Sequence, residues 1–398
     1  MIRKNLVILL IIILFLSSLT FYFITLNGNK SKKNQINNFD IDSINISEIE
    51  NSFNLSKNWL ISNLKDKGCF NYSYNPSEEE YSSKNNMIRQ LMASRVLADM
   101  SRTDIDLRDL HQRNLDFIFD YWYKENDDIG YIYFSSKSKL GAMAMALRTL
   151  VFSPFFDYYV NEAEKLVNCI LYLQKDDGSF RAWYIEPPYS YDEDYLLTFY
   201  SGEAILSLVD FYLMTGNESV LDAAILSQDY YVDLYVDNLT DNYYPAYVPW
   251  HTQSLNKIYK ITKNEVYSEA VFVLNDKLLE IQDTINNETL GRFYNSSTPE
   301  YGSPHSSSDG VYTEGLVYAY EIAELIGDNY HMDLYYDAIA LGVYNLMNLQ
   351  YTYNNTNNFV FPERIIGAFR YNKDDDRIRI DTTQHTMDAY MKIFEIFG

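Results

Sequence analysis

A two-helix pattern that recurs six times is the feature that most restricts how this chain can fold. Each unit has an amphipathic helix, a polar stretch that usually contains glycine before an aromatic pair, and a second helix rich in small apolar residues. The first helices fall within residues 56–74, 114–134, 166–184, 227–248, 275–294 and 346–361, and the second within 89–99, 140–150, 201–214, 251–262, 313–326 and 383–396. Recurrence every roughly 50–70 residues indicates a repeat architecture.

The two kinds of helix favour a closed ring over an open stack. Apolar residues at i, i+3, i+4 and i+7 leave the first helices a polar face, as an outer ring requires. The second helices are apolar nearly all round, as in LGAMAMAL at 140–147, and the last is as apolar as the others, whereas an open stack needs polar ends. The sequence predicts an all-α fold, an (α/α)6 toroid of six helical hairpins over residues 49–398. The fourth unit lacks the glycine, and the sixth is expected to carry asparagine instead.

Composition restricts the partners of this chain. Apolar residues make up 47% of it, and 38 Tyr and 22 Phe supply material for a core, which argues against disorder. The formal charge of −23 excludes nucleic acid as a partner, because phosphate binding depends on clustered Lys and Arg.

The amino-terminal region indicates attachment to a membrane. After a short flank at residues 1–5, residues 6–26 are apolar and uncharged, long enough to cross a hydrocarbon layer of roughly 30 Å as a helix. A cleaved signal peptide has a shorter apolar core, about 7–15 residues, and a small-residue cleavage site. We therefore expect an uncleaved transmembrane signal anchor, followed by a polar spacer at 27–48.

Glycosylation sequons favour an extracytoplasmic location for the folded domain. They lie at Asn45, Asn54, Asn71, Asn217, Asn238, Asn287, Asn295 and Asn354. Basic residues flank the apolar segment on both sides, so charge alone does not decide the orientation. The expectation is a single-pass membrane glycoprotein with its C-terminal domain outside the cytoplasm.

The cysteines and acidic runs do not suggest a metal site. Cys69 and Cys169 allow one disulfide at most and are too few for a thiolate site, and whether they are bonded stays open. The acidic run at 374–376 lacks the spacing of a calcium loop and is expected to be a solvated turn. We expect no metal and no cofactor.

If the inner helices run parallel, their N-terminal ends gather at one rim, which is a natural place for a pocket. Glu203 and Glu314 are expected in the first turns of two inner helices, where each is either a working carboxyl or a residue that stabilises the helix dipole. Glycoside hydrolysis needs such a pair, roughly 5–5.5 Å apart for retention or 6.5–9.5 Å for inversion. We take both as catalytic candidates.

Three further catalytic candidates lie at the expected starts of inner helices: Asp381, His251 and His385. A lone histidine is more often a core residue, but two at equivalent repeat positions favour a function. His305, in a nearby loop, is a third histidine to consider.

Substrate binding is expected from aromatic, amide and arginine side chains at the same rim. Aromatic faces stack on sugar rings, and arginines hold carboxylates or sulfates, although the arginines equally suit an internal network with nearby acids. The candidates are Tyr200, Trp250, Gln253, Tyr312, Arg370, Arg379 and Gln384.

Four stretches resemble inner-helix entries of the six-hairpin glycosidase-like superfamily: YSGEAILSL at 200–208, WHTQSLNKIYKIT at 250–262, GVYTEGL at 310–316 and RIDTTQH at 379–385. The resemblance covers roughly residues 49–398, and some of it is similar to the C-terminal domain of glucuronyl C5-epimerases. It implies the toroid fold more firmly than a reaction, and it transfers no catalytic role to a particular residue.

The leading hypothesis is a membrane-anchored, extracytoplasmic carbohydrate-active enzyme acting on a poly- or oligosaccharide, most simply a glycoside hydrolase with one carboxyl as acid and another as base or nucleophile. One alternative is a uronate C5-epimerase, in which Arg370 or Arg379 binds the carboxylate while Tyr or His exchanges a proton. The other alternative is a non-catalytic glycan-binding or assembly scaffold, which the fold also permits.

Overall fold

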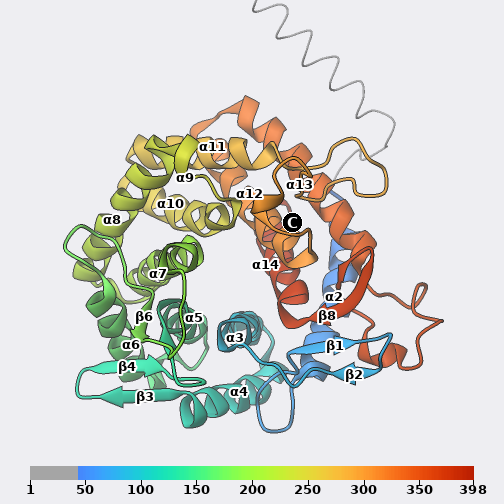
Figure 1. Ribbon diagram of the computed structural model, residues 1–398, viewed down its shortest axis with the longest axis horizontal. Helices are drawn as coiled ribbons and strands as arrows, with labels where there is room; N and C mark the ends of the chain where they lie inside the picture. The colour runs from blue at the N-terminus through green and yellow to red at the C-terminus, as the bar shows by residue number, and fades with distance from the viewer. Residues whose placement is uncertain (1–43) are drawn as a thin grey trace, which may run out of the picture.

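Six helical hairpins form a ring in the computed structural model, which describes residues 44–398 except the side chains at 240 and 241 (Figure 1). The flank at 1–5, the expected membrane segment at 6–26 and the spacer up to residue 43 lie outside the described residues. The first described helix begins at Ile46 and already belongs to the ring.

Twelve long helices of this part of the chain alternate between an outer and an inner ring. The outer helices are α2 (Ile46–Asn63), α4 (Arg108–Tyr121), α6 (Val160–Leu173), α8 (Glu218–Val232), α11 (Glu265–Leu279) and α13 (Asn329–Leu349). The inner helices are α3 (Met87–Thr103), α5 (Leu140–Val151), α7 (Glu193–Thr215), α10 (Val248–Thr262), α12 (Ser306–Ile326) and α14 (Ile380–Phe397). Each inner helix packs on the next, and α14 packs on α3, which confirms a closed (α/α)6 toroid.

Short strands lie between the helices, and one sheet joins the first and last units of the ring. A four-stranded antiparallel sheet has the order β2 (Glu80–Tyr81), β1 (Ser73–Asn75), β8 (Asp375–Arg379) and β7 (Arg370–Asn372), with Tyr74 opposite Ile378. Two hairpins pair β3 (Tyr123–Asn126) with β4 (Ile129–Ile132) and β5 (Ser138–Lys139) with β6 (Trp183–Ile185). The first and last units are therefore tied by strands as well as by helices.

Glycine turns after four of the outer helices pack against the next outer helix of the ring. Gly291 and Gly367 have φ of 87° and 96°, and a Cβ added there would lie 1.8 Å from the Leu341 carbonyl oxygen and 2.1 Å from that of Leu55. Only glycine tolerates both the left-handed backbone and this approach. Because Leu55 belongs to α2, the sixth unit closes the ring with the same contact, so the expectation that asparagine replaces its glycine was wrong.

Two inner helices begin earlier than their sequence pattern suggests. Asp192 accepts a hydrogen bond from the backbone N–H of Tyr195, so α7 starts at Glu193, and His305 caps α12 in the same way. Such side-chain acceptors satisfy N–H groups that the first helical turn leaves unpaired. Glu203 and Glu314 consequently lie in the third turn of their helices, and the expectation that they occupy first turns was wrong.

The inner ring forms the core of the protein. Among the described helices, α7 is long and apolar enough to cross a membrane, but 67% of its most apolar 18-residue window is buried, as expected for an inner helix.

Cys69 and Cys169 are both buried free thiols, so no disulfide joins them.

Candidate functional site

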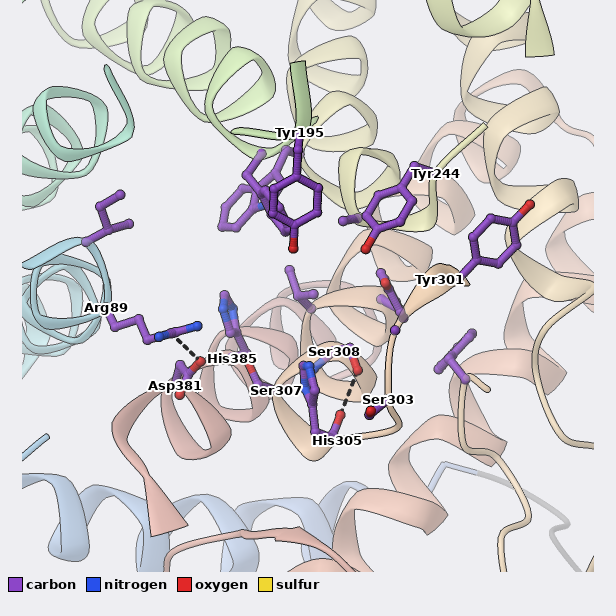
Figure 2. Close-up of a pocket in the computed structure, with 18 of the residues that line it drawn as sticks. Arg89, Tyr195, Tyr244, Tyr301, Ser303, His305, Ser307, Ser308, Asp381 and His385 are labelled. Atoms are coloured by element: carbon purple, nitrogen blue, oxygen red, sulfur yellow. Dashed lines mark hydrogen bonds and ion pairs between the residues drawn. The ribbon is translucent and has the colours of Figure 1, made fainter. Parts of the chain in front are cut away.

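A cavity of about 380 Å³ opens where the N-terminal ends of the inner helices meet (Figure 2). This first cavity is lined by side chains from α3, α7, α10, α12 and α14 and from the loops that precede them. They include Arg89, Tyr195, Tyr200, Glu203, Tyr244, Trp250, Tyr301, His305, Tyr312, Arg379, Asp381 and His385. The rim that the repeat pattern pointed to is therefore hollow.

A carboxylate held by two arginines forms one wall of the first cavity. Asp381 Oδ2 lies 2.7 Å from Arg89 Nε and 2.7 Å from Arg379 Nη2. Burial raises the pKa of Asp381, but the two guanidiniums outweigh it and hold that pKa well below its usual range. Asp381 is therefore ionised and positions the arginines, and two guanidiniums around one carboxylate leave this wall with excess positive charge.

Glu203 presents a protonated carboxyl to the same cavity. The residue is 2% exposed, and burial raises its pKa to about 8 despite the nearby Lys139 and Arg148 cations. Its Oε2 atom accepts no hydrogen bond from the described residues. A Cβ added to Gly141 would lie 2.2 Å from that oxygen, so the glycine of α5 makes room for the carboxyl. A protonated acid in this position is able to donate a proton at neutral pH.

Two neutral imidazoles also line the first cavity. Burial lowers the pKa of both His305 and His385 to about 4. His305 Nδ1 accepts a hydrogen bond from the Ser308 backbone N–H at 3.0 Å, so the neutral ring carries its proton on Nε2. The His385 ring meets the edge of Trp250 at a centroid distance of 5.9 Å. A neutral imidazole has one ring nitrogen that can accept a proton, so either ring can act as a base at pH 7.

Aromatic rings supply much of the remaining wall. Figure 2 shows Tyr195, Tyr244 and Tyr301 on one side of the cavity, across from Arg89, His305 and His385. Tyr195 is 49% exposed at the mouth, whereas Trp250 and Tyr312 are buried deeper. A cavity with rings at several depths and polar groups opposite them matches the requirements for binding a sugar.

Seven of the twelve sequence candidates line the first cavity, and they come from four inner helices and the residue that precedes α14. They are Tyr200, Glu203, Trp250, Tyr312, Arg379, Asp381 and His385. The twelve candidates do not include Arg89 or the tyrosines of the mouth, which also line the cavity. The signal for Arg89 was present, since it is a cation in the first turn of an inner helix.

The structure places the other five candidates elsewhere. His251 lies in the core, where Ser201 Oγ and Gln228 Nε2 are each 3.2 Å from its ring nitrogens and burial lowers its pKa to about 3. Gln253 and Gln384 are fully buried within the inner ring. Arg370 stacks on Tyr351 with its guanidinium carbon 4.7 Å from the ring centroid, and Glu314 lines a different cavity.

One cluster within residues 44–398 has the composition of a metal site. Ligand atoms of Glu314, His385 and Asp388 all lie within 4.8 Å of one another. Asp388 already pairs with Arg95, and burial raises the pKa of Glu314 to about 8. A cation there would face a guanidinium and a protonated acid, so we assign the cluster no metal.

Comparison with known proteins identifies the fold. No protein-family model matches the sequence, and no curated protein matches it either. Among solved structures, D-mannose isomerase has 10% identity and a TM-score of 0.67, covering 88% of this chain and 97% of that one. A sugar epimerase from a ruminal bacterium has 11% identity and a TM-score of 0.67, covering 89% and 99%. A GH76 α-mannanase from Bacteroides thetaiotaomicron has 12% identity and a TM-score of 0.60, covering 90% and 96%.

These alignments cover nearly the whole ring in each protein. The predicted resemblance to six-hairpin glycosidase-like toroids is thereby confirmed for the fold. At 10–12% identity the likeness carries no residue roles, which have to come from the cavity itself.

Proposed function

We propose that this six-hairpin glycosidase-like toroid is a carbohydrate-active enzyme that moves a proton at a sugar carbon next to a carbonyl or carboxyl group, as isomerases and epimerases do. The observation that carries the proposal is the pair of neutral imidazoles, His305 and His385, in an aromatic cavity that also holds two arginines. The solved sugar isomerase and epimerase share this fold, which is consistent with such chemistry.

In the proposed proton transfer, one histidine acts as the base, and the arginines and the other histidine stabilise the charge that develops. His385 is neutral, and its Nδ1 atom has no hydrogen-bond partner among the described residues. It takes the proton from the carbon, and the electron pair of the C–H bond moves to form an enolate. The negative charge that develops on oxygen is stabilised by Arg89 and Arg379 and by a hydrogen bond from the Nε2–H of His305. In isomerisation, the hydroxyl proton of the first carbon moves to the enolate oxygen, and protonated His385 returns its proton to the neighbouring carbon. In epimerisation, the enolate turns over in the cavity, and protonated His385 returns its proton to the other face of the same carbon.

Glycoside hydrolysis is the second candidate, and the state of Glu203 favours it. A carboxyl with a pKa of about 8 is protonated at neutral pH and suits the general acid that protonates a leaving sugar oxygen. Asp381 is the other carboxyl that lines the cavity within the described residues, but its oxygens are occupied by arginines. Hydrolysis would therefore rely on His385 to activate water.

The location of the enzyme is part of the proposal. The uncharged apolar run at residues 6–26 and the sequons support an anchored domain outside the cytoplasm. Extraction of the full chain from membranes by alkaline carbonate, without detergent, would contradict the anchor.

The reaction is tested by exchange with solvent. The full chain in detergent is incubated in D₂O with a panel of aldoses, ketoses, uronates and oligosaccharides, and the products are followed by NMR. Deuterium on a sugar carbon identifies proton transfer, whereas new reducing ends without deuterium identify hydrolysis.

Two histidine variants locate the chemistry. We expect His385→Asn and His305→Asn each to lower the rate by about a hundredfold or more. Asparagine is itself a good helix N-cap, so the second variant keeps the start of α12. The control is His331→Asn on α13, which should keep full activity because His331 pairs with Asp328 and Asp276 on the outer ring. Full activity in His385→Asn would remove the proposed base.

A further inference from the structure

A second cavity, of about 440 Å³, lies toward the C-terminal ends of the inner helices. Its charged and polar lining comes from α3, α10, α12 and α14. These side chains are Arg95, Asp99, Asn256, Lys257, Lys260, Glu314, Tyr318, Asp388, Lys392 and Glu395. Within residues 44–398 the two cavities share no lining residue, so the second one needs its own explanation.

Buried cations outnumber buried carboxylates around the second cavity. Arg95 pairs with Asp388, both Arg148 and Lys257 pair with Asp210, and both Lys260 and Lys392 pair with Glu321. Among side chains that are at most 15% exposed, four cations thus meet three carboxylates, whereas Lys260 is 35% exposed. Glu314 does not restore the balance, because burial raises its pKa to about 8 and keeps it largely protonated at pH 7. Asp99 and Glu395 are 28% and 63% exposed, pair with Arg102 and Lys392, and lie with Lys260 at the more exposed edge.

Two guanidinium nitrogens near the cavity lack hydrogen-bond acceptors. Arg95 Nε and Arg148 Nη2 are buried without a partner among the described residues, and the carboxyl oxygen Glu314 Oε2 has no partner there either. The guanidiniums of Arg95 and Arg148, together with the ammonium of Lys257, surround the ring of Phe152 at 4.7, 5.6 and 5.8 Å. A guanidinium has donors only, so whatever completes this set has to accept hydrogen bonds.

Helix dipoles explain part of this arrangement. Basic side chains near helix C-termini complement the partial negative charge there. That effect accounts for the presence of cations, but it explains neither donors left without acceptors nor a hollow of ligand size, roughly 300–1,000 Å³ in known sites. A chain with a net charge of −23 repels anions over most of its surface, which makes a local positive excess selective.

We propose that the second cavity binds a small oxyanion, either free or carried by a sugar, through Arg95, Lys257 and Lys260. This inference stands independently of the reaction proposed for the first cavity. The ligand is expected to accept hydrogen bonds from the unpaired guanidinium donors while the lysines neutralise its charge.

The test is calorimetric titration of the full chain in detergent with inorganic phosphate at pH 7. Phosphate should bind, and Lys257→Gln and Lys260→Gln should each weaken binding about tenfold, the effect of losing one charge-assisted hydrogen bond. The matched control is Lys277→Gln on α11. Lys277 is 34% exposed and pairs with Glu280, and Lys260 is 35% exposed and pairs with Glu321, so the two lysines match in exposure and in having a carboxylate partner.

Competition from the first cavity is measured with Arg89→Gln. If this variant abolishes phosphate binding while both cavity lysine variants leave it unchanged, the anion binds at the first cavity and the proposal fails. Failure of phosphate to bind at millimolar concentration also overturns it. Thermal melts of the lysine variants close to that of the parent chain show that any loss is local.

A second titration series identifies the source of the anion. If glucose 6-phosphate binds more tightly than phosphate while glucose does not bind, the site takes an anionic sugar. Equal affinity for the two phosphates indicates a free oxyanion. Both results support the oxyanion site, whereas tighter binding of glucose than of phosphate contradicts it.

Discussion

Two carboxyls seven positions apart on α7 illustrate how the two ends of the ring differ. Glu203 and Asp210 are 2% and 3% exposed, yet burial raises the pKa of Glu203 to about 8 while the pKa of Asp210 lies below its usual value. Asp210 is as desolvated as Glu203, but the cations of Lys257 and Arg148 contact it directly. Burial therefore decides the charge only where no partner is present.

The same contrast separates the two cavities. At the first cavity, neutral imidazoles and a protonated acid face aromatic rings, an arrangement suited to proton transfer. At the second, ion pairs lie beside two guanidinium nitrogens that have no hydrogen-bond acceptor among the described residues, an arrangement suited to holding an anion. On α14 both chemistries occupy one helical stripe, since Asp381, His385, Asp388 and Lys392 follow each other at intervals of four, three and four residues.

The largest expected effect comes from removing the buried partner at the second cavity. Asp210→Asn leaves Arg148 and Lys257 without their carboxylate, and we expect the free energy of unfolding in urea to fall by about 3–5 kcal/mol. Asp381→Asn removes the carboxylate partner of two arginines at the first cavity. Because Arg89 is 32% exposed, water can solvate it, and the free energy of unfolding should fall by less. Equal losses would show that the two ends do not differ in solvent access.

A change at the seam between the first and last units tests how much closure of the ring stabilises the fold. Gly367→Ala adds a strained backbone and a contact with the Leu55 carbonyl, together about 2–5 kcal/mol of unfolding free energy. Gly327→Ala is the control, because its φ is also positive at 77° but an added Cβ meets no described atom within 4 Å. Its expected cost is the backbone strain alone, about 1–2 kcal/mol. Similar losses in both variants would contradict the seam.

A change in the pH dependence of stability is expected from the two protonated carboxyls, one near each cavity. Glu203 and Glu314 have native pKa values near 8, above the unfolded value of 4.5, so the native state holds protons that unfolding releases. Their contribution to the free energy of unfolding therefore falls as pH rises from about 4.5 to 8. Glu203→Gln and Glu314→Gln should each flatten this decline in urea titrations, whereas Glu288→Gln, whose pKa lies below its usual value beside Lys373, should not. An unchanged slope would mean that the native carboxyl is ionised.

Sequence periodicity predicted the ring but misjudged where two of its helices start. The residues before 201 and 313 looked like loop, because Tyr, Asp and Ser dilute the apolar pattern there. The caps at Asp192 and His305 extend both helices and carry Glu203 and Glu314 into third turns. The helical spacing of four, three and four residues from Asp381 places His385, Asp388 and Lys392 on the same face of α14. That spacing could have pointed to the second cavity, which Asp388 and Lys392 line.

The sequence by itself determined the six hairpins, the small residues that let inner helices meet and seven of the side chains that line one rim, because helical periodicity is a local property. Only the tertiary structure decided which charges meet. Asp381 forms ion pairs with arginines from α3 and from the end of β8, whereas Glu203 forms none within the described residues. His251 lies in a polar part of the core instead of the cavity. Electrostatic energies depend on distances of a few ångströms between helices far apart in the chain, and no pattern along one helix encodes those distances.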